Sequence, residues 1–80
     1  MTAENVEERL REIMSVVLKR PIADGEEVCR DREVTWDSLK HVELLFAIEG
    51  ALDVTFDPEE MPMLTTLEKF VASVKAHRAS

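Results

Sequence analysis

Eighty residues can form one small domain, and a chain of this length has little room for an enzyme cleft and the residues that support it. Its 17 acidic residues outnumber its 10 basic ones, and the formal net charge of -7 argues against binding to nucleic acid or to an anionic membrane surface. The same charge suits partners with basic patches, although a need for solubility would also account for it.

The single cysteine, Cys29, leaves no internal disulfide and no cysteine-based metal site, and it indicates a reducing compartment. No apolar run approaches the ~20 residues of a membrane span, and the first residues lack the basic start and apolar core of a signal peptide. We therefore expect one domain over residues 1–80 that is a cytoplasmic monomer, with no membrane and no nucleic acid among its partners.

The first predicted element is a helix over about residues 6–18. Its apolar side chains recur at helical spacing while charged ones occupy the other faces, and the apolar set is Val6, Leu10, Ile13, Met14 and Val17. Either Thr2 or Asn5 can cap this helix, and Pro21 stops it near residues 19–20.

Residues 21–36 contain proline, glycine and many charges, which predicts a long loop. Its isolated apolar residues Ile22, Val28 and Val34 are the expected anchors to the core. Loops longer than about 12–15 residues are uncommon in compact domains and are often functional.

The second predicted helix, from about Ser38 to Leu52, carries two apolar stripes. The expected core face consists of Leu44, Leu45, Ile48 and Leu52. The other stripe lies at the end of the helix that carries Ser38 and consists of Leu39, Val42 and Phe46. Either the loop 21–36 covers this second stripe or a partner protein does, and the pattern leaves both interpretations open.

Two acidic residues of this helix, Glu43 and Glu49, are either ordinary solvated charges or the rim of a docking strip. In the second interpretation Leu39, Val42 and Phe46 form the apolar centre of the strip, and the two glutamates orient a basic partner.

The last third of the chain predicts one short helix and one longer helix. Asp57-Pro58-Glu59-Glu60 is a capped helix start, which Pro62 cuts to about one turn. Thr65 with Glu68 predicts a second capping box, followed by an inward stripe of Leu67, Phe70, Val71 and Val74, and His77 complements the dipole at the helix end. The chain is therefore predicted to be all-α: a small four-helix bundle with three main helices, one short helix and a long loop after the first helix.

Ser38 places a hydroxyl at the start of a helix, where free N–H groups and the helix dipole favour a phosphate ester. The simpler alternative is that Ser38 only caps the helix, a role for which Asp37 also competes. Serine catalysis is not expected, because the chain has no Gly-x-Ser-x-Gly motif around Ser38. His41 is expected to be an exposed residue near Ser38 and not its catalytic base. We expect no enzyme activity, no catalytic residue and no metal site, because the usual His and Cys metal motifs are missing.

With these features the chain resembles the acyl carrier protein family over nearly all of its length. The family motif is approximately D-L-G-x-D-S-L followed by V-E-L, and the sequence here reads Glu33-Val34-Thr35-Trp36-Asp37-Ser38-Leu39, then Val42-Glu43-Leu44. The resemblance implies a covalent 4′-phosphopantetheine arm on Ser38, next to Asp37, transferred from coenzyme A by a separate phosphopantetheinyl transferase with magnesium. The thiol of the arm would hold acyl groups as thioesters.

The partners that this resemblance implies are acyl-loading and acyl-processing enzymes with basic docking patches, in fatty-acid, polyketide or other specialised biosynthesis. The chain departs from the family at Thr35, Trp36, Lys40, His41 and Gly50. These departures favour a specialised carrier. Trp36, Lys40 and His41 also motivate the alternative of a carrier-like interaction module that is never modified.

Overall fold

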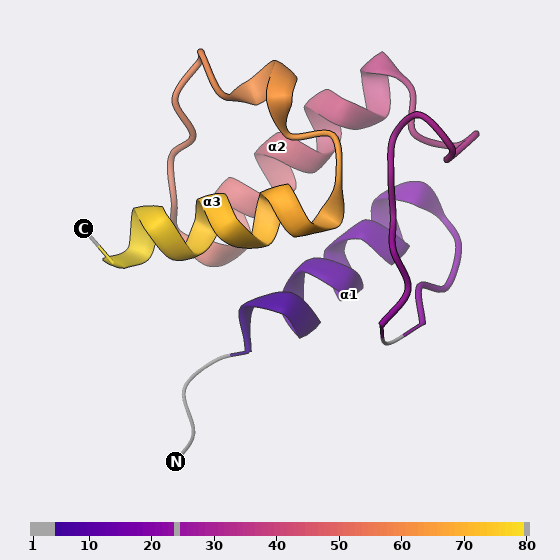
Figure 1. Cartoon of the computed structure of the whole chain (residues 1–80), viewed down its shortest axis with the longest axis horizontal. Coiled ribbons are helices and arrows are strands. Elements are labelled where there is room, and N and C mark those ends of the chain that lie inside the picture. Colours follow the sequence, from indigo (N-terminus) through magenta and orange to yellow (C-terminus); the bar gives the residue numbers. More distant parts are fainter. Residues whose placement is uncertain (1–4, 24, 80) are drawn as a thin grey trace.

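A computed structural model describes residues 5–23 and 25–79 of the chain and shows an all-α fold within them. Three α-helices, α1 (Val6–Leu18), α2 (Ser38–Leu52) and α3 (Leu67–Ala79), are joined by a 3-10 turn, η1 (Met61–Met63), between the last two (Figure 1). The predicted three main helices are confirmed, and the short element is a 3-10 turn. None of the helices in the described ranges is long and apolar enough to cross a membrane.

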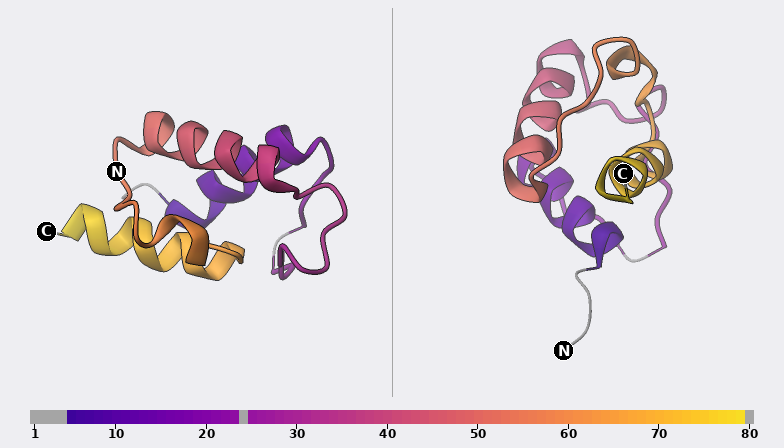
Figure 2. Two further views of the ribbon diagram at one scale, coloured as in Figure 1. Left: turned by 90° about the horizontal axis from the view of Figure 1, so that it is seen from above. Right: turned by 90° about the vertical axis from the view of Figure 1, so that its left-hand side faces the viewer.

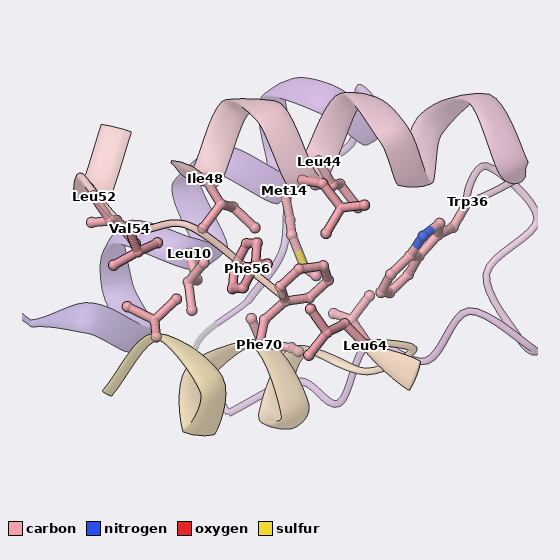
Figure 3. Packing of buried hydrophobic residues seen from close by; sticks show 14 of the residues in the cluster. Leu10, Met14, Trp36, Leu44, Ile48, Leu52, Val54, Phe56, Leu64 and Phe70 are labelled. Atoms are coloured by element: carbon pink, nitrogen blue, oxygen red, sulfur yellow. The ribbon is translucent and has the colours of Figure 1, made fainter. Parts of the chain in front are cut away.

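The helix α1 packs against both α2 and α3. The segment that links α2 to α3 runs between those two helices on the side away from α1 (Figure 2). Side chains from all three helices and from both linking segments form one core cluster. Figure 3 shows this cluster with Trp36 at one end and with Leu52 and Val54 at the other.

Local polar contacts set both ends of α1. The Glu8 N–H group donates to Asn5 Oδ1 at 3.1 Å, so Asn5 is the cap, and the alternative cap Thr2 lies outside the described residues. Lys19 ends the helix in the left-handed conformation, with φ of 59°, before Pro21. The helix is fully buried along Leu10, Met14 and Leu18, while Val6, Ile13 and Val17 pack partly against the core.

The bounds and core face of α2 are as predicted. Its buried side chains include Leu44, Leu45, Ile48 and Leu52. Asp53 closes the helix with φ of 56°, and the Phe56 N–H group then donates to the Glu49 carboxylate at 2.9 Å. This contact turns the chain back so that Phe56 enters the core.

The long loop contacts the core at Ile22, Val28 and Trp36. Val28 is 2% exposed and Trp36 is 3% exposed, whereas Val34 is 95% exposed, so the prediction of Val34 as an anchor is wrong. The reason is a turn in which the Trp36 N–H group donates to the Glu33 carbonyl at 3.0 Å. This turn leaves Val34 outside and brings the larger indole ring inward.

Arg20 holds the two limbs of this loop together. Its guanidinium bonds the Glu33 carboxylate at 3.0 Å and the Glu26 carboxylate at 2.6 Å. These hydrogen bonds lower the pKa of both glutamates, and they raise the pKa of Arg20 itself. Ion pairs from Arg20 therefore hold the loop in place, because few of its apolar residues contact the core.

Two predictions about the last third of the chain need correction. Pro62 does not end the short element, because a turn at residues 58–60 continues into η1 with Pro62 inside it. Thr65 does not cap α3: the Lys69 N–H group donates to Thr66 Oγ1 at 3.0 Å. The Thr65 carbonyl instead accepts a bond from the Arg30 N–H group at 2.8 Å, so the helix begins one residue later.

Candidate functional site

Ser38 is the first residue of α2, and its neighbour Asp37 is the cap. The Lys40 N–H group donates to Asp37 Oδ1 at 2.9 Å, while Ser38 is exposed. Asp37 therefore takes the capping role that the sequence left open between the two residues. The hydroxyl of Ser38 lies at the positive end of the α2 dipole and is not needed to cap the helix.

Arg30 lies against this hydroxyl. Its guanidinium donates to Ser38 Oγ at 3.2 Å. The backbone of Arg30 is held by the bond to the Thr65 carbonyl, and the next residue back, Cys29, forms an isolated bridge with Thr66 at the start of α3. A guanidinium and a helix N-terminus thus converge on one oxygen, an arrangement that favours a bound anion.

Sequence reasoning did not find Arg30. The residue lies eight positions before Ser38 in a loop that has no periodic pattern. The contact between Arg30 and Ser38 depends on how the loop is attached to α3. The sequence offered one signal for this contact, which was a basic residue in the long loop before the serine.

His41 is buried, at 7% exposed, so the prediction that it is exposed is wrong. The Trp36 Nε1–H group donates to His41 Nδ1 at 3.2 Å, and His41 Nε2 lies 2.7 Å from the Met61 carbonyl. Because Nδ1 accepts, the network assigns the proton to Nε2, which donates to Met61. Both ring nitrogens are thus engaged away from Ser38, which counts against His41 as a base for that hydroxyl.

The second stripe of α2 is open to solvent. Leu39 is 67% exposed, Val42 is 45% exposed and Phe46 is 68% exposed, so the loop 21–36 does not cover them. We call these three residues and Glu43 the α2 surface. Glu43 lies on this surface and pairs with Lys40 Nζ at 3.2 Å.

Glu49 differs from the other predicted docking residues. It is half-buried, and its carboxylate binds the Phe56 N–H group, so it has a structural role at the C-terminal end of α2. We therefore leave Glu49 out of the α2 surface.

An open hollow of about 700 Å³ lies between the start of α1, the loop and α3. Its apolar lining includes Val28, Leu67 and Val71, and Arg32 and Lys75 contribute charge. Ser38 is not among its lining residues, so the hollow is separate from the serine.

No protein-family model matches the chain, and the curated proteins contain no match to it.

Proposed function

We propose that the protein is an acyl carrier that holds acyl intermediates as thioesters on a 4′-phosphopantetheine arm attached to Ser38. The observation that carries this proposal is the exposed Ser38 hydroxyl, which lies at the start of α2 under the Arg30 guanidinium. A serine that is not needed for capping and lies beside the Arg30 guanidinium and the positive end of α2 suits a phosphodiester.

The physical gain comes from two sources. A negative group in the first turn of a helix gains about 0.3–1 kcal/mol from the dipole. An arginine–phosphate hydrogen bond is charge-assisted and roughly twice as strong as a neutral one. In the attachment step Ser38 Oγ gives up its proton and forms the ester bond to phosphorus, while the phosphoanhydride bond of coenzyme A breaks and adenosine bisphosphate leaves with the electron pair.

The arm would supply the thiol that carries the cargo, and the protein would position the arm for partner enzymes. The partners in this proposal are a phosphopantetheinyl transferase and acyl-loading and acyl-processing enzymes of fatty-acid, polyketide or other specialised biosynthesis. The exposed α2 surface, beside Ser38, offers them an apolar contact with a Glu43 rim. A cytoplasmic monomer that forms a four-helix bundle, with η1 as its short element, completes the proposal.

Intact mass spectrometry tests this function directly. The apo protein is incubated with coenzyme A, magnesium and a transferase of broad specificity. We expect the addition of one phosphopantetheine to the wild type and no addition to Ser38→Ala. An unchanged wild-type mass, or the same addition on the alanine variant, would contradict the proposal.

A second candidate is a carrier-like interaction module that is never modified. The open α2 surface favours it, because docking there needs no covalent group. This candidate predicts a stable partner complex in which Ser38→Ala has no effect and Phe46→Glu weakens binding. Loss of the complex in the alanine variant would count against it.

A further inference from the structure

Three potential metal ligands from two separate segments of the chain meet beside the C-terminal half of α3. Asp57 and Glu60 come from the segment before η1, and His77 comes from the last turn of α3. One ligand atom from each lies within 4.8 Å of the others, and His77 Nε2 is 2.6 Å from Glu60 Oε2. One imidazole nitrogen and two carboxylate oxygens therefore converge from two separate elements.

Neighbouring groups hold two of these side chains in place. The Ser73 hydroxyl donates to Glu60 Oε1 at 2.6 Å, and the Asp57 N–H group donates to Glu60 Oε2 at 2.8 Å. The Phe56 ring meets the His77 ring edge-on, with ring centroids 6.0 Å apart. In metal sites, supporting residues orient the ligands in the same way.

We propose that Asp57, Glu60 and His77 bind one divalent transition-metal ion, with zinc the best fit. Imidazole and carboxylate groups are both zinc ligands, and three protein ligands leave a fourth tetrahedral position for water. The two carboxylates match the charge of the ion. The site is separate from Ser38 and does not depend on the proposed carrier function.

A metal ion here would tie the segment before η1 to the end of α3. Binding to the folded state alone raises the melting temperature. The proposal therefore predicts both saturable binding and a stability change.

Isothermal titration calorimetry with Zn²⁺ at neutral pH tests the site on the full chain. We expect one ion per wild-type chain and a melting temperature that rises with Zn²⁺ and falls back with a chelator. Asp57→Asn removes one charged ligand but leaves the main-chain bonds of that residue to Glu60, and we expect it to weaken binding more than about tenfold, as should His77→Gln. Ser73→Ala, which frees the Glu60 carboxylate, should weaken binding about 10–100-fold.

The matched control is Glu59→Gln. This neighbouring glutamate is exposed and lies outside the cluster, so its loss should leave the isotherm unchanged. Circular dichroism establishes that each variant is folded before titration. An absence of saturable wild-type binding, or an unchanged isotherm in folded His77→Gln, would overturn the proposal and leave the His77–Glu60 contact as a hydrogen bond alone.

Discussion

The hydrogen bond between Trp36 and His41 should be visible as a coupling free energy. Trp36→Phe keeps an aromatic ring in the core but leaves His41 Nδ1 buried without a donor, which costs about 1–3 kcal/mol. His41→Leu leaves the indole N–H group unpaired at similar cost. The Met61 carbonyl still accepts a bond from the Leu64 N–H group at 3.3 Å in that variant.

The double variant has neither orphaned group. Its loss of stability should therefore be smaller than the sum of the two single losses, by about 0.5–3 kcal/mol. A domain of 80 residues is stable by roughly 4–12 kcal/mol, so each single variant should remain largely folded. The melting temperature should fall by about 4–8 °C for each kcal/mol lost.

Urea unfolding followed by circular dichroism measures the four proteins of this cycle, because two of them lack the only tryptophan. Val34→Ala is a suitable control, since Val34 is 95% exposed and its loss should change the free energy of unfolding by less than about 0.5 kcal/mol. Single-variant losses that add to within about 0.5 kcal/mol would refute the coupling.

Four further predictions concern single positions. Asp37→Ala should lower the free energy of unfolding by about 0.5–2 kcal/mol in urea melts, because α2 loses its cap. Phe46→Glu should change it by less than about 0.5 kcal/mol yet weaken partner binding, and unfolding of this variant would show that Phe46 belongs to the core. Gly50→Ala should stabilise α2 by about 1 kcal/mol, since an added Cβ meets nothing within 4 Å. Arg20 lowers the pKa of Glu33 below its ordinary 4.5, so the stability that the Arg20–Glu33 pair contributes is complete above pH 4.5 and is lost as the pH falls further. Thermal melts should therefore show the melting temperatures of the wild type and Arg20→Gln converging in acid.

The helices could be predicted from sequence because their signals are periodic or local. The core face of α2 follows from apolar spacing, and the side chains of Asn5 and Asp37 make cap bonds within three residues of themselves. Thr65 and Thr66 are both suitable cap residues for α3, so the local sequence fits either of them. The choice between them is decided by the contacts of residues 29–30 with the start of α3.

The contacts around the sites could not be predicted in the same way. An isolated apolar residue in a loop has no periodic neighbours, so the sequence could not show that Trp36 enters the core while Val34 stays outside. Arg30 meets Ser38, and Glu60 meets His77, only after separate elements have packed. The chemical type of each residue was readable from the sequence, but its partner was set by the tertiary fold.

The cap of α2 is Asp37 and not Ser38, and this has a consequence for the lifetime of the protein. The bond that closes the start of α2 belongs to Asp37, so esterifying or freeing the Ser38 hydroxyl leaves that bond in place. A form with a phosphate ester on Ser38 should therefore keep its capped helix and resist a protease at least as well as the form without it. Adding or removing a group at Ser38 should therefore not produce an uncapped form of α2 that a protease could cleave more readily.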